Sequence, residues 1–235
     1  MENNNLSKHI SGQFNIELET VRSEVLALGG LVEQQISKVL QALIENNSEL
    51  AQQVTEQEKL VNDYEVAIDQ ECVRIIAKRQ PTASDLRLMM AIIKIINDLE
   101  RIGDLVEHAA KIMINSENTI PDAVKVNLET LGSHIIKMLQ NVLDSFARMD
   151  VEAAVKVHQS DKKVNMMHEG IVRQLLTYMM GDSRSIPFML EVLFTCRDLA
   201  RIGDHCKNLA EHIIYFVRGQ DVRHASSQDI QQLLN

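Results

Sequence analysis

The heptapeptide DLERIGD at residues 98–104 returns as DLARIGD at residues 198–204, with one change, 100 residues further along the chain. Upstream of both copies, further matches follow an offset of 103 residues: Gly29 and Gly132, Leu40 and Leu143, Val61 and Val164, Asn62 and Asn165, Ile68 and Ile171. A turn that is three residues shorter in the second copy reconciles the two offsets. Self-similarity on this scale indicates that the chain is a duplication of one structural unit.

Apolar residues recur at three- and four-residue steps over long stretches of each copy, which is typical of amphipathic helices. In the first copy this pattern predicts a helix over residues 14–46 and a second helix that is capped by Ser48 and ends before Pro81. The segment TASD at residues 82–85 opens a third helix, which runs to about Asn115. The inward-facing positions where the second and third helices meet are predicted to include Cys72, Val73, Ile76, Leu86 and Met89.

The second copy repeats this scheme. It predicts a fourth helix to about Met149, a fifth capped by Asp150, and a sixth that follows the GDSRSIP turn at residues 181–187 and continues to about Arg218. Helices of about 30 residues that are joined by short loops pack antiparallel. With only three Pro and 3% aromatic residues, the composition also favours helices over sheet.

We therefore predict an all-α fold, a tandem duplication of two antiparallel three-helix bundles with six long helices. The expected parts are an N-terminal tail (1–13), a first bundle (14–115), a linker (116–121), a second bundle (122–218) and a polar C-terminal tail (219–235).

Composition narrows the function classes. The net charge is -9 and no dense cluster of Lys and Arg occurs, so nucleic-acid binding is not expected. The N-terminus lacks the pattern of a signal peptide and no apolar run approaches about 18 residues, which predicts a cytoplasmic protein. Its three cysteines, Cys72, Cys196 and Cys206, show no CxxC spacing and are predicted to be core thiols. No GxGxxG, Walker, GxSxG or HExxH motif is present, so we expect no enzyme.

Acidic residues and asparagines, whose side chains carry oxygen, follow four of the predicted helices at four-residue steps, a spacing that places them on one helix face. They are Glu65 and Asp69, Glu100 and Asp104 in the first copy, and Asp161, Asn165 and Glu169, Asp204 and Asn208 in the second. One interpretation is a carboxylate site between facing helices for a divalent or trivalent metal ion such as Fe, Zn, Mn or Mg. The other is a solvated acidic surface, paired with neighbours such as Arg101. Asp98 points away from these stripes, and His108 and His212 lie outside the register of the repeat.

Several long segments carry a resemblance to a known family: SKHISGQFN (7–15), CVRIIAKRQPTASDLR (72–87), GIVRQLLTYMMGDSR (170–184) and LARIGDHCKNLAEHI (199–213). With the duplicated unit, they make the chain similar to the PhoU family over nearly its whole length. The resemblance implies an accessory role in the phosphate-specific transport system. Such proteins keep the phosphate regulon silent when phosphate is plentiful, through contacts with a membrane sensor histidine kinase and with the ATPase subunit of the phosphate ABC transporter. A homodimer, peripheral at the inner membrane through its partners, is also expected.

The resemblance bears on the acidic stripes too. The family's ExxxD motif, associated with metal clusters in some members, maps onto Glu65 and Asp69 and onto Glu100 and Asp104. In the second copy Ala200 and Asn165 stand in place of carboxylates, so we expect weaker metal binding there. The alternative function is a carboxylate metal-binding helical protein with a structural or metal-dependent enzymatic role.

The turn between the second and third helices is basic. Lys78, Arg79 and Arg87 make it a candidate contact for an acidic surface of a partner protein. The other interpretation is a solvated turn followed by a helix cap.

Overall fold

The computed structural model describes residues 12–114, 118–223, 225 and 230 and contains six long helices, as predicted. They are α1 (Gly12–Glu45), α2 (Ser48–Arg79), α3 (Ala83–Ile114), α4 (Asp122–Arg148), α5 (Val151–Gly181) and α6 (Ile186–Arg218), with a short 3₁₀ helix η2 (Ser183–Ser185) before α6. Most of the predicted N-terminal tail, residues 1–11, and part of the predicted linker, residues 115–117, lie outside the described residues. In the C-terminal tail, which was expected to be polar throughout, Val222 and Ile230 are buried.

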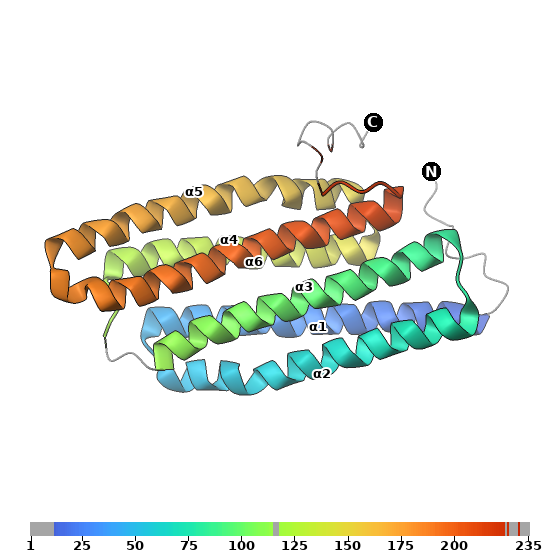
Figure 1. Ribbon diagram of the computed structural model, residues 1–235, viewed down its shortest axis with the longest axis horizontal. Helices are drawn as coiled ribbons and strands as arrows, with labels where there is room; N and C mark the ends of the chain where they lie inside the picture. The colour runs from blue at the N-terminus through green and yellow to red at the C-terminus, as the bar shows by residue number, and fades with distance from the viewer. Residues whose placement is uncertain (1–11, 115–117, 224, 226–229, 231–235) are drawn as a thin grey trace.

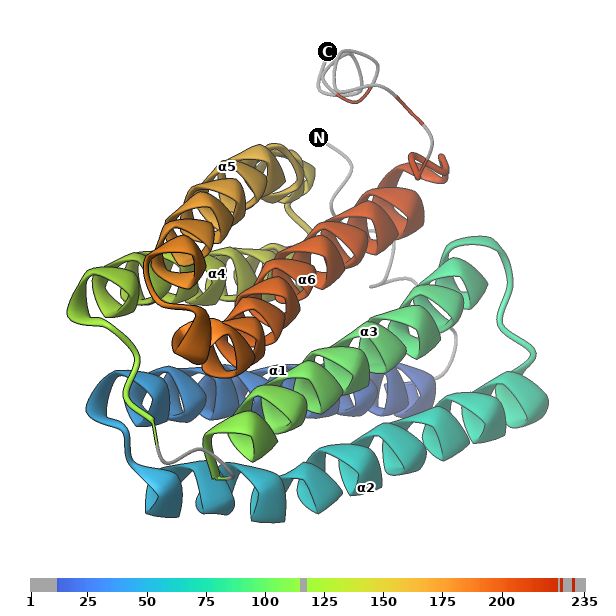
Figure 2. The same cartoon turned by 60° about the vertical axis from the view of Figure 1, so that its left-hand side comes forward.

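The helices run along the long axis of the molecule and form two three-helix bundles, with α4, α5 and α6 above α1, α2 and α3 in Figure 1. Consecutive helices within each bundle run antiparallel, which the short connections require. The outermost helices are α2 on one side and α5 on the other (Figure 2). Between them α3 packs on α6 and α1 packs on α4, and the α3–α6 contact is as extensive as the contacts within a bundle. The two copies therefore share one continuous interface.

The helix ends follow local capping chemistry. Asn47, not the predicted Ser48, caps α2, because its side-chain oxygen accepts a 3.0 Å hydrogen bond from the Leu50 amide. In the second copy the predicted cap Asp150 accepts a 3.0 Å hydrogen bond from the Ala153 amide. Asn47 and Asp150 are related by the offset of 103, so the duplication extends to the caps.

The core is made of the apolar stripes, and the three cysteines are buried free thiols, as predicted. Two predicted inward positions are wrong, since Val73 is 54% exposed and Leu86 is 39% exposed, whereas Cys72 and Met89 are buried. Val73 is exposed because α2 lies at the edge of the molecule and packs mainly on α1 and α3 of its own bundle, so that it buries a narrower stripe of its surface. Among the described residues, no helix is long and apolar enough to cross a membrane.

Two repeated glycines make the contact between α1 and α4 possible. A Cβ atom on Gly29 would lie 2.4 Å from Cδ2 of Leu143, and one on Gly132 would lie 2.3 Å from Cδ1 of Leu40. The duplication relates one pair to the other, because Gly29 corresponds to Gly132 and Leu143 corresponds to Leu40. The sequence repeat thus marks a reciprocal contact in which each copy inserts a leucine above the glycine of the other.

Changing Gly29 to valine should destabilise the protein, because the added side chain displaces Leu143 from a closely packed contact. We expect Gly29→Val to lower the free energy of unfolding by about 2 kcal/mol, measured by urea denaturation. Gly30→Val is the matched control, since Gly30 is on the same helix and has no atom within 4 Å of its would-be Cβ. Equal stability of the two variants would contradict the close α1–α4 contact.

Candidate functional site

The predicted acidic residues of the first copy gather on one face of α2 and α3. Burial raises the pKa of Glu65, with a further contribution from Asp69. Burial likewise raises the pKa of Glu100, and Asp104 and Glu65 add to that rise. Because Glu65 of α2 contributes to the raised pKa of Glu100 of α3, these carboxylates of the two ExxxD pairs lie near each other.

Basic side chains balance part of this charge. Arg101 lies 3.0 Å from the carboxylate of Asp104 and 3.4 Å from that of Glu100. Lys111 is 2.6 Å from Glu107, one turn further along α3. The interpretation that Arg101 pairs with neighbouring carboxylates is therefore confirmed.

A fifth carboxylate, which the sequence did not single out, lies behind this acidic face. Glu58 of α2 is buried against Gly103 of α3, where a Cβ would come within 2.9 Å of its Oε2. Both of its carboxylate oxygens are buried without a hydrogen bond. Burial raises the pKa of Glu58 to about 7, and Asp104, Glu107 and Glu100 contribute in that order, while the nearby Gln35 amide offsets part of the rise.

The signal that could have revealed Glu58 was present in the repeat. Glu58 and Asp161 are equivalent under the offset of 103, and Asp161 was among the predicted site residues. Acid pairs at four-residue steps were the pattern that predicted the site, and Glu58 has Val54 and Asn62 at those steps, so it was missed.

The acidic face carries the negative charge that would attract a cation, but its side chains are not arranged to coordinate one. A buried carboxylate without a hydrogen bond, surrounded by further acids, is stabilised by a nearby positive ion. Among the residues that the structure describes, however, no three His, Cys, Asp or Glu side chains stand close enough to hold a metal ion. A cation here would be held by side chains that turn toward it on binding.

In the second copy the predicted acidic residues do not gather in one place. Asp161 is buried, accepts a 3.3 Å hydrogen bond from Asn165 and lies 3.9 Å from Nζ of Lys207. Burial raises the pKa of Asp204, with Asp161 as the next cause. These two acids therefore share a site, and Lys207 supplies positive charge to it.

The other two predicted residues of this copy lie elsewhere. Glu169 is on the surface, 3.8 Å from Arg173. The amide of Asn208 turns to the first bundle, where it donates a hydrogen bond to Asp98. The four-residue spacing predicted the helix face on which Glu169 and Asn208 lie. The packing of a neighbouring helix decides whether a side chain on that face lies next to another carboxylate.

The most extensive polar cluster of the interior lies between the bundles, where α3 crosses α6. Asp98 of α3 interacts with three side chains of α6, at 2.7 Å from His205 Nδ1, 2.9 Å from His212 Nε2 and 3.2 Å from Asn208 Nδ2. In the reciprocal direction Asp198 of α6, which is 2% exposed, lies 2.5 Å from Nδ1 of His108. We refer to these six residues as the inter-bundle network.

Four of the six residues of the network follow the symmetry of the duplication. Asp98 and Asp198 are the first residues of the repeated heptapeptide, and His108 and Asn208 are related by the same offset of 100. Burial on its own would raise the pKa of Asp98, but the hydrogen bonds with His205, His212 and Asn208 outweigh it and hold the pKa at about 2. Asp98 is therefore a carboxylate whose charge is stabilised by the other copy.

The three basic residues predicted to contact a partner have different environments. Lys78 is exposed. Arg87 lies beside Gly219 at the end of α6, where a Cβ would be 3.7 Å from its Cζ. Arg79 binds Glu17 of α1 through two contacts, from Nε at 2.8 Å and from a terminal nitrogen at 3.0 Å. The side chain of Arg79 is therefore engaged within the protein, and a contact of these three basic residues with a partner stays a prediction.

Reversing the charge of Arg79 should accordingly destabilise the fold. The hydrogen bond from Arg79 is the main reason that the pKa of the buried Glu17 falls to about 2. We expect Arg79→Glu to lower the thermal unfolding midpoint clearly more than Lys78→Glu does, because only the first leaves Glu17 facing another carboxylate. Equal midpoints in thermal unfolding followed by circular dichroism would contradict this role.

Comparisons with known proteins agree with the duplicated architecture. Two stretches of the chain, residues 25–113 and 128–213, each match the PhoU domain. The chain is 54% identical over 234 residues to "Phosphate-specific transport system accessory protein PhoU" of Serratia marcescens, covering 100% of this chain and 96% of that protein. It is 53% identical to the protein of that name from Escherichia coli (strain K12), covering 100% and 97%.

Solved structures support the same assignment. The crystal structure of PhoU from Pseudomonas aeruginosa superposes with a TM-score of 0.82 at 47% identity, over 88% of this chain and 100% of that one. The phosphate transport system regulatory protein PhoU from Streptococcus pneumoniae gives a TM-score of 0.82 at 28% identity, over 89% and 99%. Because two stretches of the chain match the PhoU domain and the relatives are similar over nearly their full length, the chain belongs to the PhoU family.

Proposed function

We propose that this protein is a regulatory adaptor of phosphate uptake and phosphate-starvation signalling that works without catalysing a reaction. In this role it represses the phosphate regulon in high phosphate, through contacts with a membrane sensor histidine kinase and with the ATPase subunit of the phosphate ABC transporter. The observation that carries the proposal is the full-length identity to proteins named as accessory to phosphate-specific transport.

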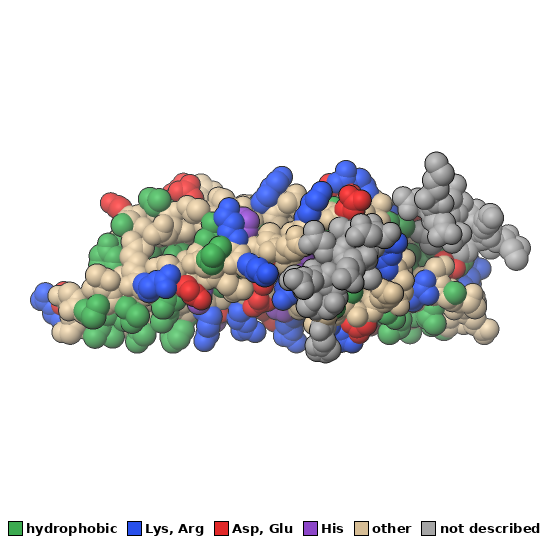
Figure 3. Space-filling view, turned by 90° about the horizontal axis from the view of Figure 1, so that it is seen from above, with side chains coloured by type: hydrophobic (Ala, Val, Ile, Leu, Met, Phe, Trp, Pro, Cys, Tyr) green, Lys and Arg blue, Asp and Glu red, His purple; other side chains and the backbone are tan. Residues whose placement is uncertain are grey.

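The surface supports a role in protein contacts. Apolar side chains are exposed near the N-terminal ends of α3 and α6, which lie at opposite ends of the molecule: Leu86 and Met90, and Ile186, Leu190 and Phe194. Viewed from above, apolar side chains gather near both ends of one long edge, with basic side chains between them (Figure 3). Surfaces of this kind are typical of protein interaction sites. We propose that they dock the kinase and the transporter ATPase.

We also propose that the acidic face of the first bundle binds a divalent cation, with Glu58, Glu65, Asp69, Glu100 and Asp104 as the residues that would hold it. The ion would supply positive charge that offsets the crowded carboxylates, which is a structural contribution. Asp161 and Asp204 form the corresponding, weaker site of the second bundle, because Lys207 already supplies charge there.

In the cell we propose a cytoplasmic homodimer that reaches the inner membrane through its partners. Light scattering on the purified protein would test the oligomeric state.

The adaptor role makes a clear genetic prediction. Deleting the gene should switch on phosphate-starvation genes in high phosphate, and a plasmid copy should restore repression, as measured by a phosphatase reporter. Continued repression in the deletion strain would contradict the regulatory role. In parallel, the purified protein should retain the kinase and the ATPase on an affinity column.

A further inference from the structure

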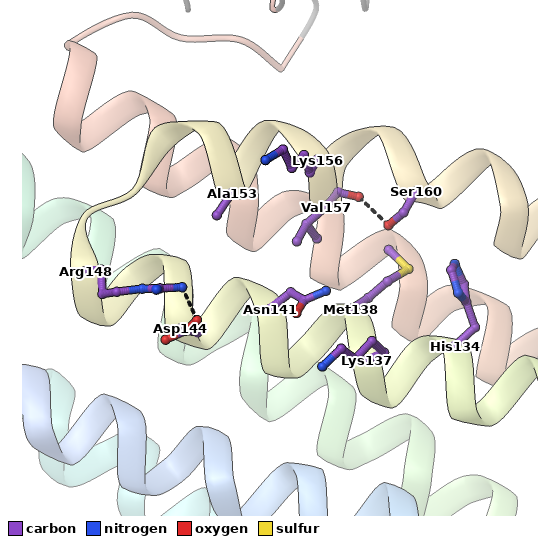
Figure 4. Close-up of a pocket in the computed structure, with 10 residues that line it drawn as sticks. All are labelled: His134, Lys137, Met138, Asn141, Asp144, Arg148, Ala153, Lys156, Val157 and Ser160. Carbon is purple, nitrogen blue, oxygen red and sulfur yellow. Dashed lines mark hydrogen bonds and ion pairs between the residues drawn. The ribbon is translucent and has the colours of Figure 1, made fainter.

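A groove with a volume of about 240 Å³ lies between the C-terminal half of α4 and the N-terminal part of α5 (Figure 4). Its polar lining is mostly basic or neutral, with Lys137 and Arg148 from α4 and Lys156 and Ser160 from α5. One carboxylate, Asp144, also lines it and pairs with Arg148. In a chain with a net charge of -9, this concentration of cations is a local exception.

The two lysines of this groove are available to a ligand. Figure 4 shows Lys137 on one wall and Lys156 on the other. Both are exposed, and neither forms an ion pair within the part of the chain that the structure describes. Each ammonium group carries three hydrogen-bond donors, so together they present six donors and two positive charges. The cationic groove therefore has unused capacity for an anion.

A histidine extends this set of donors. His134 also lines the groove, and its Nε2 atom is buried without a hydrogen-bond partner. A buried polar nitrogen without a partner is costly, and a turn of the imidazole ring toward the groove would let it donate a hydrogen bond to a bound anion. The hydroxyl of Ser160, in contrast, already donates to the Val157 carbonyl at 2.8 Å.

The duplication provides an internal comparison. Under the offset of 103, the first copy has uncharged or acidic residues where the second has its cations: Leu31 for His134, Gln34 for Lys137, Glu45 for Arg148 and Gln53 for Lys156. The same fold therefore exists in this chain with and without the positive groove. The cations are not required by the packing of the bundle, so the second copy carries them for another reason.

We propose that this groove binds a small phosphate-class oxyanion, either inorganic phosphate or the phosphate group of a compact monoester. The two lysines can give charge-assisted hydrogen bonds to the oxygens of such an anion. The volume of the groove is below the range of roughly 300–1,000 Å³ typical of sites for drug-sized ligands, which suits a compact ligand. The proposal is independent of the adaptor role, because binding is measured on the purified protein without partners.

The test is calorimetric titration of the purified protein with inorganic phosphate, and with glycerol phosphate as the monoester, at constant ionic strength set with chloride. The variant Lys137→Gln/Lys156→Gln gives the second copy the glutamines of the first and should weaken binding at least tenfold. The control Lys162→Gln/Lys163→Gln removes the same charge from exposed positions on α5 outside the groove and should change affinity less than twofold. Backbone amide resonances of Ala153, Lys156 and Ser160 should shift on binding.

Tighter binding of inorganic phosphate or of glycerol phosphate identifies which source the groove prefers, and either result supports the proposal. No binding to the unaltered protein would overturn it. So would an equal loss of affinity in the two double variants, because binding would then reflect overall charge. Circular dichroism of both variants confirms that they remain folded.

Discussion

Replacing Asp98 with alanine is expected to lower the free energy of unfolding by about 3–5 kcal/mol, the largest loss predicted for any single change in this protein. Asp98 is 9% exposed and interacts with His205, Asn208 and His212 of the other bundle. Without its carboxylate, three partly buried polar groups of α6 lose their partner, and each unsatisfied group is costly. The α3–α6 contact should weaken as a unit, since all three partners lie on one helix.

Urea denaturation at neutral pH measures this loss. Asp98→Asn retains the shape of the side chain and removes only its charge, so it should cost less than Asp98→Ala. Asp63→Asn, at an exposed position of α2, is the control and should leave stability within about 0.5 kcal/mol of the unaltered protein. If Asp98→Ala unfolds at the same urea concentration as the control, the inter-bundle network does not hold the bundles together.

The contribution of Asp98 should also depend on pH. Its pKa is held at about 2 in the folded protein, below the ordinary value of 3.8. A carboxylate with a lowered folded-state pKa stabilises the protein above its unfolded pKa and loses that stabilisation as the pH falls toward the folded value. The difference in stability between the unaltered protein and Asp98→Asn should therefore shrink as the pH falls between about 4 and 2.

Glu58→Gln is expected to have the opposite effect and to stabilise the protein by about 3 kcal/mol at pH 8. Glu58 is buried, its oxygens have no hydrogen bond, and its pKa is raised from 4.5 to about 7 by burial and by Asp104, Glu107 and Glu100. Above pH 7 the folded protein must hold a buried negative charge that the unfolded chain exposes to water. Glutamine keeps the shape of the side chain and removes this charge.

The sign of the pH dependence follows from the raised pKa. A group with a raised folded-state pKa favours folding below its unfolded pKa, and this advantage is lost as the pH rises through the folded value. The unaltered protein should therefore lose stability between about pH 4.5 and 7 relative to Glu58→Gln. Glu56→Gln, at an exposed position of the same helix, should show no such difference. Parallel pH profiles for the unaltered protein and Glu58→Gln would contradict the assignment.

The same pair of proteins tests the proposed cation site. Adding Mg²⁺ or Mn²⁺ at pH 8 should raise the unfolding midpoint of the unaltered protein, because a cation offsets the charge of Glu58 and its neighbours. Glu58→Gln should respond less, since one of the charges that attracts the ion is absent. An equal response of both proteins would place the cation away from the acidic face of the first bundle.

Several features of the site could be predicted from the sequence because they depend on residues of one helix. The four acids Glu65, Asp69, Glu100 and Asp104 were predicted from their spacing, and in the structure both Asp104 and Glu65 raise the pKa of Glu100. The repeat related Gly29 to Gly132 and Leu40 to Leu143, and in the structure these residues form the close contact between α1 and α4. The spacing and the repeat needed only the linear sequence.

Other features depended on how helices meet and could not be predicted from the sequence. The ion pair of Arg79 with Glu17 forms where the end of α2 meets the start of α1. Asn208 was predicted to share a site with Asp204, but its amide donates a hydrogen bond to Asp98 of α3. Glu58 and Asp98 were not singled out, although the repeat contained a signal for each. Asp98 heads the repeated heptapeptide, and Glu58 is the counterpart of Asp161.

The sequence by itself determined six helices, their caps and ends to within a few residues, the duplication and the membership of the PhoU family, since periodicity, capping and repeats are local or linear properties of a chain. The tertiary structure alone decided which polar groups meet, because the partners of Asp98 are more than 100 residues away and depend on the rotation and crossing of α3 and α6. A helical pattern states which face a side chain occupies. Only the packing of another helix against that face decides whether a carboxylate there is solvated, as Glu169 is, or buried without a partner, as Glu58 is.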